Sequence, residues 1–133
     1  MPLKLKLRPN ERVVVNGCVI RNEGRQTTLT VDNFAQILRE KDILQPEQAT
    51  TPGRAAYVRI QLLLLGEGDA VLLHKEAAAA LERLQGAFAA SDDARHRVLE
   101  AADALSRRDF YKALAALRDV FAHEDRVLGR TAA

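Results

Sequence analysis

Hydrophobic and polar residues alternate strictly at the start of the chain. Three leucines alternate with three cations over this stretch: Leu3, Leu5 and Leu7 with Lys4, Lys6 and Arg8. Because successive side chains of a strand point to opposite faces, the pattern predicts a strand with its leucines in a core and its cations about 7 Å apart outside. The row of cations has two interpretations. It either protects a solvated edge strand against aggregation or forms a binding surface.

Short β-branched segments separated by turn residues continue to about residue 42. The separators are Pro9-Asn10, Asn16-Gly17 and the segment 22–24, which are typical of tight hairpins. They predict four strands, at residues 3–7, 12–15, 19–21 and 27–31. The segment FAQILREKDIL, residues 34–44, is compatible with a helix, but the preceding hairpins need a partner. We therefore interpret it as a fifth strand.

The hydrophobic period changes to that of helices after a polar, proline-containing linker. Thr51-Pro52 is a typical N-cap and first helical position, and Gly66 is a typical stop. Asp69, Ser91 and Asp109 each precede further helical patterns. In the last pattern the apolar positions share one face: Phe110, Leu114, Leu117, Phe121 and Leu128.

These patterns predict an α+β fold in which a small N-terminal antiparallel β-sheet or barrel of about five strands precedes a C-terminal bundle of three to four helices. The expected organisation is a β-rich module at residues 1–45, a linker at 46–52 and a helical region at 53–133. A small open sheet leaves strand edges, so a homo-oligomer is a possible assembly.

Charge is distributed unevenly between the two halves. Residues 1–59 carry 10 Lys+Arg against 6 Asp+Glu, a net charge of +4, whereas residues 60–133 carry 10 against 12, a net charge of −2. The basic half has only one aromatic residue, Phe34, before residue 57. This indicates recognition of RNA through phosphates, arginines and backbone groups rather than base stacking. The candidate RNA-binding residues are Lys4, Lys6, Arg8, Arg12, Arg21, Arg25, Arg39 and Lys41.

The residues offer little for catalysis or for holding a metal or cofactor. His74, His96 and His123 fall on different predicted helices, and no phosphate loop, nucleophile elbow or Cys–His spacing is present. We expect no enzyme, metal site or cofactor. Cys18 is the only cysteine, which we expect to be a small buried side chain without a disulfide. No signal peptide or membrane span is apparent, so we expect a cytoplasmic protein.

Three segments resemble the FlbT family of flagellar biosynthesis regulators: MPLKLKLRPNERVVVNGCVI, TTLTVDNFAQILREKDILQPEQATTPGRAAY and FYKALAALRDVF. The most specific of these residues are REKDILQPE, residues 39–47. The resemblance implies a post-transcriptional regulator, such as a repressor, that binds the 5′ leader of flagellin mRNA and controls its translation or lifetime. It also implies the small protein FlaF as a partner.

The N-terminal part is also similar in layout to the carbon storage regulator family of RNA-binding proteins. On that comparison Arg39, in LRE, matches an arginine that contacts RNA in that family. Leu7 falls where that family has a basic residue, with Lys6 and Arg8 on either side. The resemblance implies that Arg39 contacts RNA beside the first strand.

The helical half suggests an alternative function. Its charge is slightly negative, and Phe110, Tyr111 and Leu114 offer apolar surface near the start of the last helix. The chain would then be an adaptor or chaperone that binds flagellin or FlaF through a helical groove, without direct contact to RNA. The other interpretation of these three residues is that they belong to the core.

Overall fold

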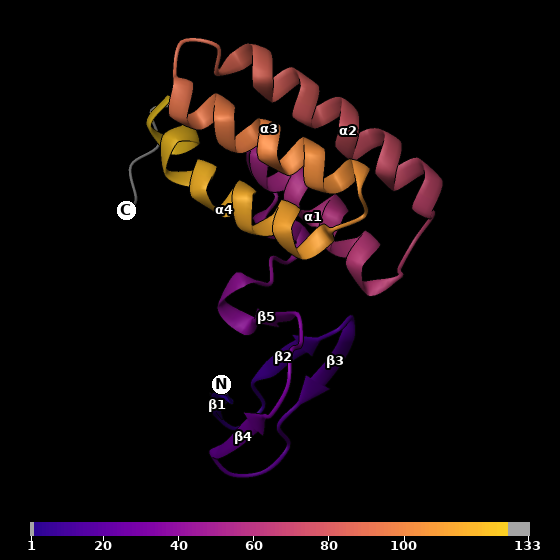
Figure 1. The fold of residues 1–133 in the computed structure, drawn as a ribbon, viewed down its shortest axis with the longest axis vertical. Coiled ribbons are helices and arrows are strands. Elements are labelled where there is room, and N and C mark those ends of the chain that lie inside the picture. The colour runs from indigo at the N-terminus through magenta and orange to yellow at the C-terminus, as the bar shows by residue number, and fades with distance from the viewer. Residues whose placement is uncertain (1, 128–133) are drawn as a thin grey trace. The chain divides into compact units, whose positions relative to one another are not determined.

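The computed structural model describes residues 2–127. Within these residues, five strands and two short 3₁₀ helices are followed by four α-helices (Figure 1). This confirms the α+β class. The chain forms two compact units, residues 1–43 and 44–133. Leu128, expected on the apolar face of the last helix, lies outside the described residues.

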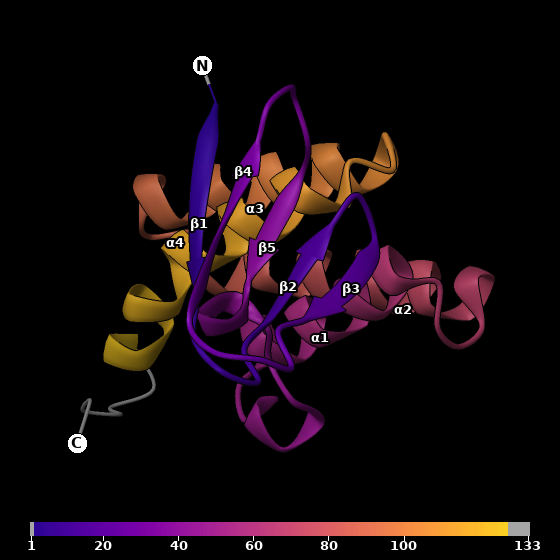
Figure 2. The ribbon, with the colours of Figure 1, turned by 90° about the horizontal axis from the view of Figure 1, so that it is seen from below.

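The N-terminal unit contains two small antiparallel sheets (Figure 2). One pairs β1 with β4, and the other has the order β3-β2-β5. Asn16 and Gly17 join β2 to β3 with φ angles of 49° and 82°, as the type I′ turn of a two-residue hairpin requires. The strand bounds are Leu3–Leu7 (β1), Arg12–Val15 (β2), Cys18–Arg21 (β3), Thr27–Val31 (β4) and Ile37–Arg39 (β5).

Side chains from both sheets form the core of this unit. Leu5, Leu7 and Val13 are fully buried, and partly buried apolar side chains pack against them: Val15, Val31 and Ile37. The expectation that all three leucines of β1 enter the core is wrong for Leu3, which is 48% exposed at the end of the strand. Cys18 is also exposed rather than buried, because it lies on the edge strand β3.

The fifth strand is shorter than expected and has a different neighbour. β5 ends at Arg39, and Glu40–Asp42 form the 3₁₀ helix η1. The ladder with β2 stops there because the backbone N–H of Arg12 donates to the Glu40 side chain, at 3.2 Å, instead of to another strand. The strand expected over residues 34–44 therefore includes Arg39 but not Lys41, which lies in η1. The strand of Arg39 pairs with β2 and not with the first strand, beside which the resemblance placed this arginine.

Each α-helix of the C-terminal unit begins where the sequence predicts. The side chains of Thr51, Asp69 and Ser91 accept hydrogen bonds from the backbone three residues later, and Asp109 does the same for Lys112. Gly66 ends the first helix in the left-handed region, with φ 70°. The bounds are Pro52–Leu65 (α1), Ala70–Ala87 (α2), Asp92–Ser106 (α3) and Phe110–Val127 (α4), with the 3₁₀ helix η2 at Pro46–Gln48 before them.

The four helices pack in sequence, and α4 closes the arrangement against α1 (Figure 1). A buried carboxylate joins these two helices. Glu124 accepts a hydrogen bond from the Thr51 hydroxyl and another, at 2.5 Å, from the Gly53 N–H. The neighbouring Asp125 carboxylate accepts hydrogen bonds from both terminal nitrogens of Arg54, from Nη1 at 2.8 Å and from Nη2 at 3.1 Å. Hydrogen bonds and an ion pair thus connect the last turns of α4 to the first turn of α1.

Candidate functional site

The outer face of β1 presents the predicted row of cations. Lys4 and Lys6 are exposed while Leu5 and Leu7 are buried, which confirms the orientation read from the alternation. The register places Lys4 opposite Thr30 and Lys6 opposite Thr28, so two hydroxyls share this face. Arg8 follows the strand, with its side chain 80% exposed. The face therefore offers ammonium, guanidinium and hydroxyl donors to a ligand.

Four of the predicted cations meet at a single cavity. The cavity is about 350 Å³ in volume and lies in the N-terminal unit. The end of β1 contributes two of its cations, and the segment from β5 into η1 contributes the other two. Two carboxylates complete the lining, which leaves a formal excess of two positive charges. The lining residues are Lys6, Arg8, Glu11, Arg39, Glu40 and Lys41.

Glu11 orients the two arginines of the cavity. Its nearly buried carboxylate accepts the backbone N–H of Arg8 at 2.9 Å and lies 3.6 Å from the Arg8 Nε. Its other oxygen lies 4.0 Å from Arg39 Nη2, and the same nitrogen donates to the Lys6 carbonyl at 3.4 Å. Arg39 therefore spans from β5 to the backbone of β1. Its Nε is buried and has no acceptor within the described residues, whereas the side chain as a whole is 39% exposed.

Glu40 plays a similar part for Arg12. Its carboxylate accepts the Arg12 backbone N–H and lies 3.5 Å from the Arg12 Nε. By contrast, neither lysine of the cavity, Lys6 or Lys41, has an anionic partner among residues 2–127. No ion pair neutralises their charges, so they are the cations of this cavity most available to an anionic ligand.

The other four candidate cations do not line the cavity. Lys4 lies further along the outer face of β1, and Arg12 is paired with Glu40. Arg21 stands opposite Arg12 at the end of β3, and Arg25 lies in the loop that follows. The acids that orient the arginines, Glu11 and Glu40, were not among the predicted site residues. The position of Glu11 directly after the Pro9-Asn10 turn is the sequence feature that could have predicted its contact with Arg8.

The helical residues proposed for partner binding differ in exposure. Phe110 and Tyr111 are half-buried at the start of α4. Leu114 is fully buried in the helical core, so its expected role as a partner contact is wrong. One turn separates it from Phe110, which places it on the face of α4 that packs within the bundle.

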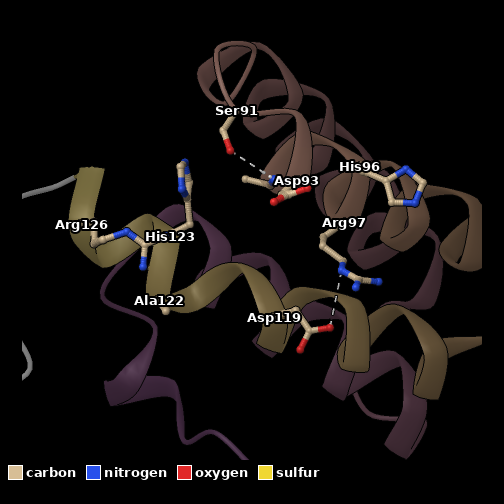
Figure 3. Close-up of a pocket in the computed structure, with 9 residues that line it drawn as sticks. Ser91, Asp93, His96, Arg97, Asp119, Ala122, His123 and Arg126 are labelled. Atoms are coloured by element: carbon tan, nitrogen blue, oxygen red, sulfur yellow. Dashed lines mark hydrogen bonds and ion pairs between the residues drawn. The ribbon is translucent and has the colours of Figure 1, made fainter.

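A larger cavity of about 570 Å³ lies between α3 and α4, and Figure 3 shows its lining. Its charges are largely compensated. Arg97 lies 3.2 Å from Glu100 and 3.7 Å from Asp119, and His96 lies 3.0 Å from Glu100. The carboxylates of Asp93 and Asp119 also line it. This balance makes it a poorer site for a polyanion than the cavity of the N-terminal unit.

Within residues 2–127, no group of three or more His, Cys, Asp or Glu side chains is placed to hold a metal ion. None of the helices between Pro52 and Val127 is both long enough and apolar enough to cross a membrane.

Comparison with known proteins gives a consistent result along nearly the whole chain. The family model described as "Flagellar protein FlbT" matches residues 3–128. The chain is 39% identical over 133 residues to the "Flagellum biosynthesis repressor protein FlbT" of Caulobacter vibrioides, covering 97% of this chain and 91% of the relative. It is 33% identical over 130 residues to the "Probable flagellum biosynthesis repressor protein FlbT" of Rhodopseudomonas palustris, covering 98% and 100%. No solved structure matches the chain.

Proposed function

The chain belongs to the FlbT family of flagellar proteins, and from this premise we propose that it binds the 5′ leader of flagellin mRNA through its N-terminal unit. The family places the chain in the regulation of flagellum biosynthesis. The proposal adds the ligand and the surface.

The convergence of Lys6, Arg8, Arg39 and Lys41 on one cavity carries this proposal. Phosphate groups of RNA are recognised by lysine and arginine, and each neutralised phosphate releases condensed counterions. Lys6 and Lys41 suit this role because no carboxylate among the described residues compensates them. The hydroxyls of Thr28 and Thr30 add donors on the same face of the β1–β4 sheet.

Arg39 is the residue best placed to contribute selectivity. A guanidinium presents several donors in a fixed plane, and the side chain of Arg39 is 39% exposed and lines the cavity. Glu11 and the Lys6 carbonyl hold Nη2 of this group in place. A base edge or phosphate oxygen in the cavity would accept hydrogen bonds from the N–H groups that remain exposed.

Regulation then follows from occlusion. A protein bound over the leader competes with ribosomes for the message or changes the access of nucleases to it. This mechanism requires binding alone, so no catalytic group is needed. Because the relatives are named repressors, we expect bound protein to lower flagellin synthesis.

Titration of fluorescent flagellin-leader RNA with the purified full-length protein tests the proposal by fluorescence anisotropy. The double variant Lys6→Gln, Lys41→Gln should weaken binding, since it removes the two uncompensated cations of the cavity. The double variant Lys75→Gln, Arg83→Gln removes two exposed charges from α2 and should bind normally. Equal affinity of the wild type for leader RNA and a shuffled RNA, or equal loss in both variants, would contradict the proposal.

A second candidate function is an adaptor that binds FlaF or flagellin through the helical unit. The supporting observation is apolar exposure at the start of α2, where Val71 is 82% and Leu72 51% exposed. Calorimetric titration with each partner, using Val71→Asp as the variant, distinguishes the two functions. Adaptor binding would be lost in this variant while leader RNA affinity stayed unchanged.

A further inference from the structure

The strand β3 leaves a hydrogen-bonding edge open. It lies at the outside of the β3-β2-β5 sheet, and all four of its residues are exposed. Apolar side chains stand on both of its faces, with Val19 49% and Ile20 37% exposed. Many proteins protect such an edge with proline, lysine or a bulge. β3 contains neither residue, and its register with β2 is unbroken.

The hairpin register shows which backbone groups this edge offers. Val15 and Cys18 flank the two-residue turn and form its hydrogen-bonded pair, and Val13 with Ile20 is the next such pair. The backbone bond from Asn22 to Glu11 continues the same alternation. The N–H and C=O groups of Val19 and Arg21 therefore point away from β2. They form a ladder that another strand can join.

Charge and side-chain placement specify what kind of strand would fit. Val19 and Arg21 share one face of the sheet with Arg12, whereas Ile20 lies on the other face. Arg21 has no anionic partner among residues 2–127, and Glu23 is the only acid between residues 12 and 31. A joining strand would thus place one set of alternate side chains beside Val19 and Arg21 and the other set beside Ile20.

We propose that the open edge of β3 binds an extended segment of a partner protein in which acidic and aliphatic residues alternate. The carboxylates lie beside Arg21, and the aliphatic side chains lie beside Ile20. Main-chain hydrogen bonds to Val19 and Arg21 supply the common binding mode of strand addition. The exposed apolar side chains and the backbone ladder favour a peptide over RNA. A second copy of the chain would bring its own Arg21 close to the first, which is unfavourable.

This site is distinct from the RNA cavity and from the apolar surface of α2, so the proposal does not depend on either function. Its test uses the full-length protein and a labelled nine-residue peptide of alternating glutamate and valine. A peptide of alternating lysine and valine serves as the control probe. Fluorescence anisotropy should show saturable binding of the glutamate peptide and little binding of the lysine peptide.

Two variants examine the backbone and the charge separately. Val19→Pro removes an N–H that points to the open edge, and we expect the peptide affinity to fall about threefold to tenfold. Val19→Thr keeps that N–H and should retain most of the affinity. Arg21→Glu should weaken the glutamate peptide about tenfold and create binding of the lysine peptide. Circular dichroism verifies that each variant is folded. If Val19→Pro does not fold, the result with Arg21→Glu decides the test.

Several results would overturn the proposal. These are absence of saturable binding to the wild type, equal binding of both peptides, or an unchanged preference in Arg21→Glu. A homodimer that Val19→Pro dissociates in sedimentation equilibrium would assign the edge to a second copy. Displacement of the peptide by leader RNA, without formation of a ternary complex, would assign the open edge of β3 to RNA.

Discussion

Removal of the Glu124 carboxylate should destabilise the helical unit strongly. The side chain is 1% exposed and satisfies two donors of the α1 N-terminus, the Thr51 hydroxyl and the Gly53 N–H. Its charge is also compensated by Arg54, whose Nη1 lies 3.6 Å away. In Glu124→Ala both donors would be left unpaired in a buried position.

The magnitude follows from these contacts. A buried donor without an acceptor costs about 1–3 kcal/mol, and breaking a buried ion pair by deleting one partner costs about 3–5 kcal/mol. These costs overlap because the same carboxylate serves all three groups, so we expect a total loss of about 3–5 kcal/mol. In Glu124→Gln the amide oxygen still accepts one hydrogen bond, but the amide N–H groups face the second donor. We expect this variant to lose about 1–3 kcal/mol of unfolding free energy.

Urea unfolding followed by circular dichroism at 222 nm measures the free energy of unfolding of the helices. Asp119→Ala is the matched control, since Asp119 lies on the same helix but has a side chain 60% exposed and a surface ion pair with Arg97. We expect the control to lose less than about 0.5 kcal/mol. A loss below about 1 kcal/mol in Glu124→Ala, the usual size of a surface ion pair, would refute the role assigned to this carboxylate.

Three further predictions concern single positions. Gly53→Ala should cost about 1–3 kcal/mol in the same urea assay, because a Cβ there would lie 2.8 Å from the Glu124 carboxylate. Leu5→Ala should destabilise the N-terminal unit by about 2–5 kcal/mol, whereas Leu3→Ala should change it by less than about 0.5 kcal/mol; equal losses of amide-exchange protection would contradict the assigned core. Arg39→Ala should weaken leader RNA binding by about 1–3 kcal/mol and reduce the preference for the leader over shuffled RNA. Unchanged binding would show that Arg39 does not contact the RNA.

Local signals in the sequence predicted most element boundaries. The Asn16-Gly17 turn, the N-caps Thr51, Asp69 and Ser91, and the stop at Gly66 all act through a few neighbouring residues. Such signals do not depend on the rest of the fold. They were therefore confirmed within a residue or two.

Features that depend on distant pairing were not predictable in the same way. The pairs β1–β4 and β2–β5 join segments far apart in sequence, and they decide that Leu3 and Cys18 are exposed. The same pairing brings Arg39 to the backbone of Lys6. Alternation identified the outward face of β1, but it could not reveal that β5 and η1 would complete a cavity there.

The sequence predicted which type of residue forms the candidate site, but only some of the positions that line it. Clustering of cations in the N-terminal half indicated a basic surface, and the structure gathers four of the eight candidates at one cavity. The carboxylates Glu11 and Glu40 were missed because their partners follow from tertiary structure. Leu114 was misassigned because an apolar face of a helix looks alike in sequence whether it meets a partner or the core of its own bundle.

The salt dependence of RNA binding tests the central proposal most directly. The triple variant Lys4→Gln, Lys6→Gln, Arg8→Gln and the wild type are titrated with flagellin-leader RNA at several salt concentrations. The variant should reduce the slope of log affinity against log salt by about 2, because each phosphate contact to single-stranded RNA contributes about 0.7.

A matched triple variant removes three exposed cations of the helical unit and should leave the slope unchanged: Lys75→Gln, Arg83→Gln and Lys112→Gln. If the β1 variant stays folded and binds the leader with the affinity and slope of the wild type, the cations of β1 only protect a strand edge, and the proposed RNA surface is wrong.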